Sequence, residues 1–267
     1  MGGSFAGKSV VITGSTQGIG LATARLVAGR GAASVTICGR NVANGETAVS
    51  EIEAMGADAM FVPADLSRQE DCFAVIDRAA ERFGRIDCLI NCCGSANRGT
   101  LEDTTLDLWD YIFAVNVRAP FFLIQRAVPV MRAGGRGGAI VSIGSIAAHG
   151  GQPYIVAYSA AKAALLVLTK NLANSLRWER IRVNALNIGW TATPTELEIQ
   201  ANVHGLGADW LEKVSRNQPF GRLLSPEDVA AALAFLASDE SSLMTGSVVE
   251  FDQKVPGAFD DNPIGAI

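Results

Sequence analysis

The stretch AYSAAKAALLVL, residues 157–168, carries a phenol and an ammonium in an otherwise apolar run. Tyr158 and Lys162 are four residues apart, so in a helix they lie on the same face, one turn from each other. An ammonium is costly to bury without a partner. Two interpretations are open. Both residues are amphipathic and reach solvent with their polar tips, or the pair is placed there for chemistry.

The chemistry that suits this pair is proton transfer during hydride transfer to a carbonyl. The carbonyl oxygen gains negative charge as the hydride arrives, so a proton donor and a hydrogen-bond donor must lie beside it. A tyrosine hydroxyl has an ordinary pKa of about 10. A cation one helical turn away stabilises the phenolate, so we expect Lys162 to lower the pKa of Tyr158.

A glycine-rich segment, TGSTQGIG at residues 13–20, leaves the first apolar run and opens a helix. Gly14, Gly18 and Gly20 allow a tight turn and a close approach of the backbone to a ligand. The N-terminus of the helix offers free N–H groups to a phosphate, and the turn after the first strand is where dinucleotides bind. The spacing differs from the commoner G-x-G-x-x-G, and a plain strand-to-helix turn is the alternative.

The end of the second apolar run should discriminate between the two nicotinamide dinucleotides. An acidic residue there would bind the adenosine ribose and repel a 2′-phosphate. The sequence instead has Gly39 followed by Arg40, whose guanidinium can bind phosphate. The residues therefore favour NADP over NAD, unless Arg40 is an ordinary surface residue.

Apolar runs rich in Val and Ile alternate with stretches of helical spacing. This alternation predicts an α/β fold, in which helices cover both faces of a parallel, doubly wound, Rossmann-type sheet. In one predicted helix, residues 225–238, Ser225 can be the N-cap and Pro226 the first helical residue. The apolar runs span residues 9–14, 34–39, 59–65, 86–94, 138–145, 181–189 and 247–252.

Composition limits the class of protein. The 267 residues are 49% hydrophobic and 18% charged, with no linker or repeat, so we expect one domain over 1–267. No apolar run approaches the roughly 18 residues of a membrane span, and the N-terminus does not resemble a signal peptide. We therefore expect a cytoplasmic protein with no membrane partner. The net charge of −5 argues against a nucleic-acid partner.

The sequence contains five cysteines but no CxxC or Cys/His cluster, so no metal site is predicted. Cys92 and Cys93 are adjacent, and four of the five lie in or beside apolar segments, as small buried hydrophobic residues do. A disulfide is not expected in a cytoplasmic chain.

From about Lys8 to Asp252 the sequence resembles the single-domain branch of the short-chain dehydrogenase/reductase family. The matching motifs occur in order: TGSTQGIG, Asp65-Leu66, NCCG at 91–94, Asn116 in FAVNV, Ser145 in SIGSIAA, and YSAAK. The resemblance implies a seven-stranded sheet and an NAD(P)-dependent oxidoreductase that acts on a secondary alcohol or ketone.

The resemblance also implies roles for particular residues. Ser145 would hydrogen-bond the substrate oxygen, Lys162 would hold the nicotinamide ribose, and Asn116 would hold a water in a proton relay through Lys162. The expected catalytic group is Asn116, Ser145, Tyr158 and Lys162. Asp65 would contact the adenine, and Asn91 would steady the central strands. The expected cofactor-binding residues are Gly14, Ser15, Thr16, Gln17, Gly18, Ile19, Gly20, Arg40, Asp65, Leu66, Asn91, Cys93, Gly94, Tyr158, Lys162, Gly189, Thr191 and Thr193.

Two positions depart from the family pattern. Cys92-Cys93 replace Asn-Ala, and their small apolar side chains fit beside a cofactor. Ile188-Gly189 replaces Pro-Gly after the sixth strand, which leaves the shape of the following loop open. Thr193 still falls where the family contacts the carboxamide or phosphate.

The substrate is the least determined feature. His149 and Gln152 follow Ser145, and the loop over residues 190–218 should form a lid. Trp190 and Glu196 are candidates for substrate contact in that loop, with His204 and Trp210 further along. The polar groups His149, Gln152 and Glu196 favour a small polyhydroxylated substrate, a sugar or polyol.

Two alternatives remain. The first is a 3-oxoacyl thioester on an acidic carrier protein, for which Arg118, Arg126 and Arg132 could form a basic patch. The second is a dinucleotide-binding sensor without catalysis.

The family is usually tetrameric, so we expect a homotetramer. The alanines and leucines around Tyr158 are consistent with a helix that faces both core and partner. The tail, residues 253–267, extends past the family's last strand, and we expect it to pack on a neighbouring subunit near its cleft.

Overall fold

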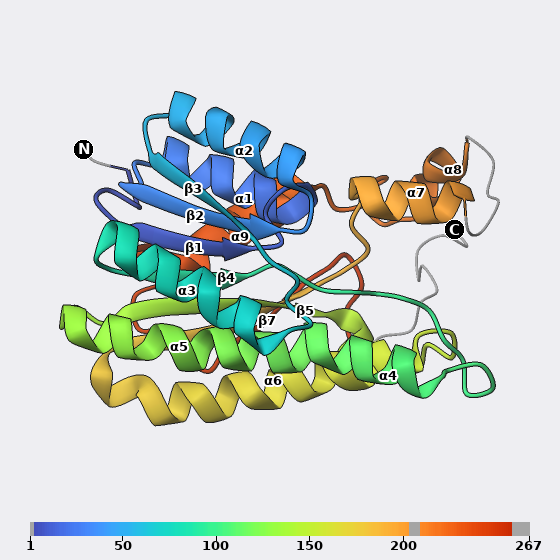
Figure 1. Ribbon diagram of the computed structural model, residues 1–267. Helices are drawn as coiled ribbons and strands as arrows, with labels where there is room; N and C mark the ends of the chain where they lie inside the picture. Colours follow the sequence, from blue (N-terminus) through green and yellow to red (C-terminus); the bar gives the residue numbers. More distant parts are fainter. Residues whose placement is uncertain (1–2, 203–208, 258–267) are drawn as a thin grey trace.

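A computed structural model describes residues 3–202 and 209–257. Seven parallel strands form one sheet in the order β3-β2-β1-β4-β5-β6-β7, with helices on both faces (Figure 1). The predicted doubly wound sheet is confirmed, and every predicted apolar run contains most or all of a strand. The strands are β1 (Ser9–Thr13), β2 (Ser34–Gly39), β3 (Asp58–Pro63), β4 (Cys88–Asn91), β5 (Gly138–Ser145), β6 (Ile181–Ile188) and β7 (Val248–Phe251).

The two faces of the sheet are covered by different sets of helices. One face carries α1 (Gly18–Gly29), α2 (Val42–Ala54) and α9 (Pro226–Ala237). The other carries α3 (Gln69–Phe83), α5 (Ala119–Gly134) and α6 (Val156–Leu176). The helices α4 (Leu106–Phe113), α7 (Pro194–Asn202) and α8 (Trp210–Arg216) lie toward one end of the molecule (Figure 1). None of the described helices is both long and apolar enough to cross a membrane.

Residues of the central strands alternate between the two cores, because successive side chains of a strand point to opposite faces. In β1, Val10 and Ile12 pack against the α1 and α9 side, whereas Val11 packs against α3 and α5. All three are fully buried. Burial on both faces explains why these strands read as continuous apolar runs.

The start of α9 agrees with its prediction in detail. The Ser225 hydroxyl accepts from the Asp228 N–H at 3.1 Å, and the Asp228 carboxylate accepts from the Ser225 N–H at 2.8 Å. This is a capping box, with Pro226 in the first helical turn.

The sheet reverses its strand order beside β1, which pairs with β2 on one side and β4 on the other. Ligands of open α/β sheets bind where the order reverses, outside the carboxyl ends of the strands. The glycine-rich segment follows β1 at that point, and residues 92–105 follow β4. The fold therefore brings the segments with the sequence motifs to one edge of the sheet.

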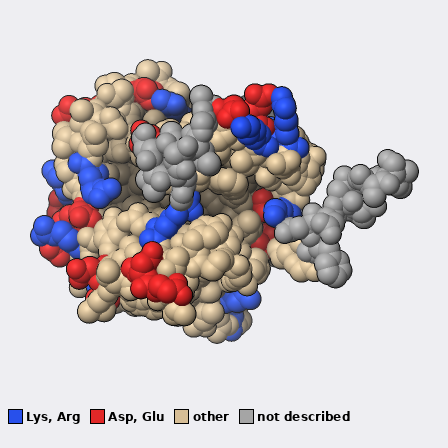
Figure 2. Space-filling view, turned by 90° about the vertical axis from the view of Figure 1, so that its right-hand side faces the viewer, with Lys and Arg blue, Asp and Glu red and all other residues tan. Residues whose placement is uncertain are grey.

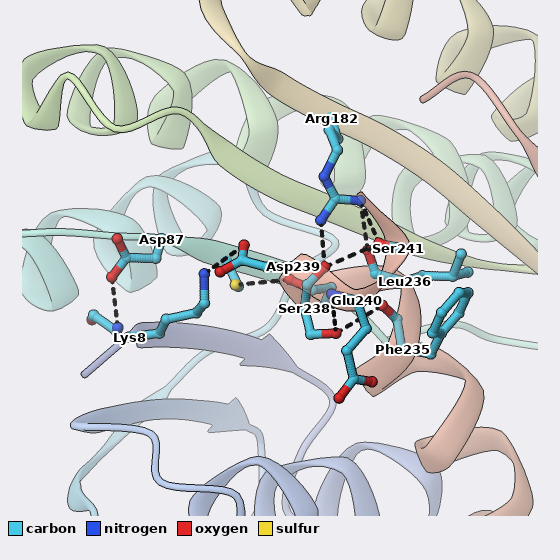
Figure 3. Close-up of polar contacts among 12 residues, drawn as sticks. Lys8, Asp87, Arg182, Phe235, Leu236, Ser238, Asp239, Glu240 and Ser241 are labelled. Carbon is cyan, nitrogen blue, oxygen red and sulfur yellow. Dashed lines mark hydrogen bonds and ion pairs between the residues drawn. The ribbon is translucent and has the colours of Figure 1, made fainter. Parts of the chain in front are cut away.

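At the opposite edge, where the strands begin, Arg182 of β6 ties α9 to the short helix Asp239–Ser241 (Figure 3). Its guanidinium donates to the carbonyl oxygens of Leu236 at 3.0 Å and Ser238 at 2.8 Å. It also donates to the Ser241 hydroxyl at 2.6 Å. Burial lowers the pKa of Arg182.

Replacing Arg182 by methionine is expected to lower the free energy of unfolding by about 2–3 kcal/mol, because buried carbonyl oxygens lose a charged donor. Urea denaturation measures the change. The control is Lys8→Met. Lys8 forms a more exposed ion pair with Asp239 at the same edge, and its loss should cost less than about 1 kcal/mol. Equal losses for the two variants would contradict the prediction.

Candidate active site

Tyr158 and Lys162 lie on α6, and their environments differ. Lys162 is only 3% exposed, and its Nζ donates to the backbone oxygen of Ile143 on β5 at 2.7 Å. Nζ lies 5.7 Å from the centre of the Tyr158 ring. The lysine therefore does not reach solvent, and the first of the two interpretations of this pair is wrong for Lys162. Burial lowers the pKa of Lys162 to about 8.

Ser145 ends β5, and its hydroxyl accepts from the Ala147 N–H at 3.2 Å. Burial raises the pKa of Tyr158, a hydrogen bond with Ser145 opposes this, and the Glu196 carboxylate raises the pKa further. The net pKa lies above the ordinary value. The sequence predicts that Lys162 lowers the pKa of Tyr158. In the structure, the effect of burying the phenol is larger than the opposing effect of its hydrogen bond with Ser145.

Asn116 is fully buried in a π-helical turn, Ala114–Arg118, between α4 and α5. Such turns are frequent at functional sites. Its side-chain amide donates to the backbone oxygens of Ile112 and Ser95, both at 2.9 Å. A Cβ on Gly94 would lie 3.0 Å from Asn116 Oδ1 and 3.5 Å from Lys162 Nζ. Asn116 and Lys162 therefore meet at Gly94, and the four expected catalytic residues form one cluster.

The glycine-rich segment has the geometry of a phosphate loop. Gly14 and Gly18 have φ of +59° and +54°, in the left-handed region that favours glycine. A Cβ on Gly14 would lie 2.8 Å from the Cα of Cys93. The helix α1 has no acidic residue in its first turn, and its N-cap, Gln17, makes no capping side-chain bond. The N–H groups at the start of α1 are thus left for an anion, and the segment fits a dinucleotide.

Other residues of this segment anchor it. The Ser15 hydroxyl donates to the Ile12 oxygen at 2.6 Å and accepts from the Cys38 N–H at 3.0 Å, which joins β1 to β2. Ile19 packs partly buried against the core of the α1 side, and a Cβ on Gly20 would lie 2.3 Å from the Gly14 oxygen. Ser15 and Ile19 therefore shape the loop from its buried side.

Arg40 is exposed at the end of β2, beside the phosphate loop. A Cβ on the preceding Gly39 would lie 2.8 Å from the Thr16 side chain. Within residues 3–202 and 209–257, Arg40 has no hydrogen bond or ion pair. Burial would raise the pKa of Asp65, but hydrogen bonds from Ser67 and the charge of Arg40 lower it. Leu66, next to Asp65, is buried in the core.

The segment after β4 connects this loop to the catalytic cluster. Asn91 donates to the Ser142 hydroxyl at 3.2 Å and so links β4 to β5. The Cys93 N–H donates to the Thr13 hydroxyl at 3.1 Å. Burial raises the pKa of Cys92 to about 12 and also raises that of Cys93, so both thiols are neutral. Among the described residues, no three His, Cys, Asp or Glu side chains come together as metal ligands would.

The loop after β6 has a defined shape without the family's proline. A Cβ on Gly189 would lie 1.8 Å from the Asp252 carboxylate, so this glycine lets the acidic side chain approach. The Thr191 hydroxyl donates to the Gly189 oxygen at 3.1 Å, and the Thr193 hydroxyl accepts from the Glu196 N–H at 3.2 Å. Gln17 donates to the Thr195 hydroxyl at 2.9 Å, and this bond joins the segment after β6 to the phosphate loop.

Glu196 of α7 makes several contacts within the segment that is predicted to form a lid. One of its oxygens, Oε1, accepts from Trp190 Nε1 at 2.9 Å and from Gln200 Nε2 at 2.6 Å. The same oxygen lies 3.6 Å from Arg98 Nη2, which comes from the segment after β4. Trp190 also stacks on Trp210, with ring centres 6.0 Å apart. The segments that follow β4 and β6 therefore meet at one carboxylate.

Arg98 was not singled out from the sequence, because a single arginine in a loop carries no distinguishing pattern. It lies 5.6 Å over the Tyr154 ring, and its Nε is buried with no partner among the described residues.

The other expected substrate residues do not form one cluster with Glu196. His149 Nε2 lies 3.1 Å from Glu250 of β7. Gln152 is half-buried, and its side chain makes no hydrogen bond to the described part of the chain. His204 lies outside the described residues.

The three arginines that could form a basic patch do not gather at the cleft. Arg126 pairs with Asp77 at 2.6 Å, and Arg132 pairs with Glu179. Arg118 donates to the Ser67 backbone oxygen at 2.7 Å. They are spread from the π-helical turn that precedes α5 to the last turn of α5. Because α5 ends just before β5 begins, Arg132 lies at the amino edge of the sheet. On the side where α7 and α8 lie, basic and acidic side chains are interspersed (Figure 2).

A phosphate loop at the reversal of a parallel sheet, next to a tyrosine, a serine and a buried lysine, defines a nicotinamide-dependent alcohol or ketone oxidoreductase. A family model described as enoyl-(acyl carrier protein) reductase matches residues 14–253. The chain belongs to the short-chain dehydrogenase/reductase family and is an oxidoreductase.

Relatives of different specificity resemble the chain over nearly its full length. Cis-4-hydroxycyclohexanecarboxylate dehydrogenase of Sinomonas cyclohexanicum is 37% identical, covering 94% of this chain and 98% of the relative. A 3-oxoacyl-(acyl-carrier-protein) reductase of Thermotoga maritima is 32% identical over 92% and 96%. The structure of L-sorbose reductase from Gluconobacter frateurii, complexed with NADPH and L-sorbose, has a TM-score of 0.89 and 32% identity, covering 97% of this chain and 100% of that one.

Proposed function

We propose that the protein transfers hydride between NADP(H) and a secondary alcohol or ketone of a small polyhydroxylated substrate, a sugar or polyol. The observation that carries the substrate class is Glu196. This carboxylate belongs to the lid and lies close enough to Tyr158 to raise its pKa. A carboxylate accepts hydrogen bonds from substrate hydroxyls and repels anionic substrates. The likeness to L-sorbose reductase supports the same class.

Each member of the catalytic cluster has a role that its surroundings suit. The dinucleotide, when bound, supplies or accepts the hydride. Tyr158 exchanges a proton with the substrate oxygen, and its raised pKa keeps it a proton donor at neutral pH. Ser145 hydrogen-bonds the same oxygen. Lys162 and Asn116 meet at Gly94. Lys162 would hold the nicotinamide ribose, and Asn116 would hold a water that returns the proton through Lys162.

The residues expected to contact the dinucleotide form three groups, one for each part of the cofactor. The phosphate loop, Gly14 to Gly20, would hold the pyrophosphate at the start of α1. Asp65 and Leu66 would contact the adenine. Cys93, Gly94, Gly189, Thr191 and Thr193 would border the nicotinamide half.

Replacing Arg40 by alanine is expected to raise the KM for NADP(H) by about 10–100-fold, because the 2′-phosphate loses a charged hydrogen-bond donor. The KM for NAD(H) should change less than about 2-fold. Initial rates with both cofactors measure the effect. Arg68→Ala is the control, since Arg68 lies nearby but already pairs with Glu70 at 2.6 Å. Parallel losses with both cofactors would show that Arg40 does not bind the phosphate.

The substrate class is tested with a panel of neutral sugars, polyols and keto or hydroxy acids. Neutral polyhydroxylated compounds are expected to have the highest kcat/KM. Glu196→Gln keeps an oxygen acceptor but removes the charge, so kcat/KM for keto acids should rise relative to neutral substrates, by about 10-fold. A wild-type preference for acids would overturn the proposal and favour a hydroxy-acid substrate, with Arg98 as the partner of its carboxylate.

The carrier-protein alternative rests on the 3-oxoacyl-(acyl-carrier-protein) reductase relative. Of the three arginines in this chain that could bind an acidic carrier, Arg126 and Arg132 are already paired with carboxylates, which weakens the case for such a carrier. Turnover of a carrier-bound 3-oxoacyl thioester that falls steeply with salt would favour it.

We also propose assembly as a homotetramer. A groove of about 820 Å³ runs between α4, α5 and α6, and a second copy of the chain suits its mostly apolar lining. That lining includes Tyr111, Phe113, Val117, Phe121, Ala164 and Val167. Sedimentation of the intact protein tests the oligomeric state. The proposed packing of the tail on a neighbouring subunit concerns residues that lie mostly outside the described part of the chain.

A further inference from the structure

Beyond the residues that would touch substrate, the geometry points to Asn187 and Glu250 as positioning residues for Ser145, acting through hydrogen bonds across three adjacent strands. This inference rests on the proposed role of Ser145 as the hydrogen-bond donor to the substrate oxygen. Neither residue belongs to a motif in the sequence, and neither is part of the catalytic cluster.

The three strands place these residues in one row. Gly144 of β5 is the register partner of Asn187 of β6, and Asn187 is the register partner of Glu250 of β7. Partners in register point to the same face of a sheet. The side chain of Asn187 can therefore contact both β5 and β7. It lies at the carboxyl edge of the sheet, where β5 ends with Ser145.

The contacts along this row are continuous. The backbone N–H of Ser145 donates to Asn187 Oδ1 at 3.1 Å. Asn187 Nδ2 in turn donates to Glu250 Oε1 at 3.0 Å. The same carboxylate oxygen lies 3.1 Å from His149 Nε2, at the end of the short helix that follows Ser145. A chain of polar contacts thus leaves Ser145 through β6 and β7 and returns to the segment just after it.

The chemistry of each group fixes the direction of these bonds. A backbone N–H can only donate, so the oxygen of the Asn187 amide must face Ser145. The amide nitrogen must then face an acceptor, and an ionised carboxylate only accepts. Glu250 therefore holds the amide in the one orientation that serves Ser145. Asn187 is fully buried, so no solvent molecule competes for the amide from outside.

Gly144 makes the close approach possible. A Cβ on Gly144 would lie 2.0 Å from Asn187 Oδ1, a distance that no real contact allows. Gly144 directly precedes Ser145 and lies within β5, so no turn explains the glycine. The close approach of the Asn187 amide does explain it.

The row matters for catalysis because it fixes the backbone from which the Ser145 hydroxyl projects. That hydroxyl must keep its hydrogen bond with Tyr158, which opposes the rise in the pKa of the phenol that burial causes. Without the Asn187 amide, the buried N–H at the end of β5 loses its partner, and the serine is free to shift. Misplacement by about 1 Å can cost about 100-fold in rate.

The experiment measures kcat, KM, cofactor affinity and the pH profile of alcohol oxidation for a small set of variants. Asn187→Ala is expected to lower kcat by about 10–100-fold, with the dissociation constant for NADPH unchanged by fluorescence titration. The profile should also move to higher pH, because a weakened Ser145 contact leaves the Tyr158 pKa higher. Tyr158 also faces Glu196 and Lys162, and both are retained in every variant.

Glu250 offers a conservative comparison on a partly exposed side chain, which should not affect folding. Glu250→Gln keeps an oxygen that accepts from Asn187, so it should restore most of the rate that Glu250→Ala loses. The matched control is Asn184→Ala. Asn184 is also a fully buried amide of β6, bonded to the Met244 oxygen at 2.8 Å and the Ser247 N–H at 3.0 Å, but it lies away from Ser145. It should lose stability while keeping kcat and the pH profile.

The inference is overturned if Asn187→Ala keeps the wild-type kcat and pH profile, or if Asn184→Ala shows the same losses. Ser145→Ala, measured in parallel, separates this result from a failure of the proposed function. Full activity of Ser145→Ala would refute the role of Ser145 itself. An inactive Ser145→Ala beside a fully active Asn187→Ala refutes only the positioning role.

Discussion

Replacing Tyr158 by phenylalanine is expected to lower kcat by about 10³-fold while binding of the dinucleotide stays within about 2-fold of the wild-type value. The change removes the only group in the proposed mechanism that exchanges a proton directly with the substrate oxygen. The phenyl ring keeps its place near Lys162 Nζ, so the packing around the buried ammonium is retained. Steady-state rates and fluorescence titration with NADPH measure the two quantities separately.

The pH dependence of the wild-type enzyme gives an independent check. Oxidation of an alcohol needs the phenolate, so its rate should rise with pH as Tyr158 loses its proton. Burial raises the pKa of Tyr158 above the ordinary value of about 10, so this rise should extend into strongly alkaline solution. Reduction needs the phenol and should remain active across the neutral range.

Turnover of every accepted substrate by Tyr158→Phe at the wild-type rate would refute the proposed mechanism. Such a result would point to a different proton donor at the site. Ser145→Ala is the companion variant, because it removes the second hydroxyl beside the substrate oxygen and leaves the phenol.

Much of the fold could be predicted because its signals are local. A buried parallel strand such as β1 is a continuous apolar run, and the start of α9 is written in Ser225, Pro226 and Asp228. The phosphate loop is also local, since its glycines and its helix are consecutive in the chain. The catalytic cluster could be found for a different reason, namely that its motifs occur in the order of a known family.

Contacts that depend on strand order could not be predicted. Asn187 and Glu250 are 63 residues apart and meet only because β6 and β7 are neighbours in a particular register. Arg98 lies in the segment after β4 and Glu196 lies in α7, after β6, yet their side chains are 3.6 Å apart. Single polar residues in loops or strands carry no pattern that distinguishes such partners from ordinary surface residues.

The expected effect of Lys162 on Tyr158 shows a second limit. Helical spacing places a cation one turn from a phenol, but it gives no information about how deeply either group is buried. In the structure, burial dominates both groups, raising the pKa of Tyr158 and lowering that of Lys162. The sequence therefore indicated which residues meet, whereas the direction of the Tyr158 pKa shift required the packing around them.

Replacing Lys162 by methionine is expected to stabilise the protein while abolishing its activity. Burial lowers the pKa of Lys162 from 10.5 to about 8, so the folded state disfavours the charged form. Methionine removes this cost, and the loss of the hydrogen bond to the Ile143 oxygen offsets only part of the gain. The free energy of unfolding at pH 7 should rise by about 1–2 kcal/mol. The kcat should fall by about 10³-fold, because the ribose and the proton relay lose their cation.

The sign of the pH dependence distinguishes this cause from better packing alone. Between about pH 8 and 10.5 the folded state has released the Lys162 proton and the unfolded state has not, so wild-type stability gains with rising pH from this group. The advantage of Lys162→Met should therefore be larger at pH 7 than at pH 10 in urea denaturation. Lys170→Met, at an exposed lysine of the same helix, should show no such difference. If the gain in the free energy of unfolding of Lys162→Met did not change with pH, its cause would be better packing. The buried charge of Lys162 would then not be what lowers the stability of the wild-type protein.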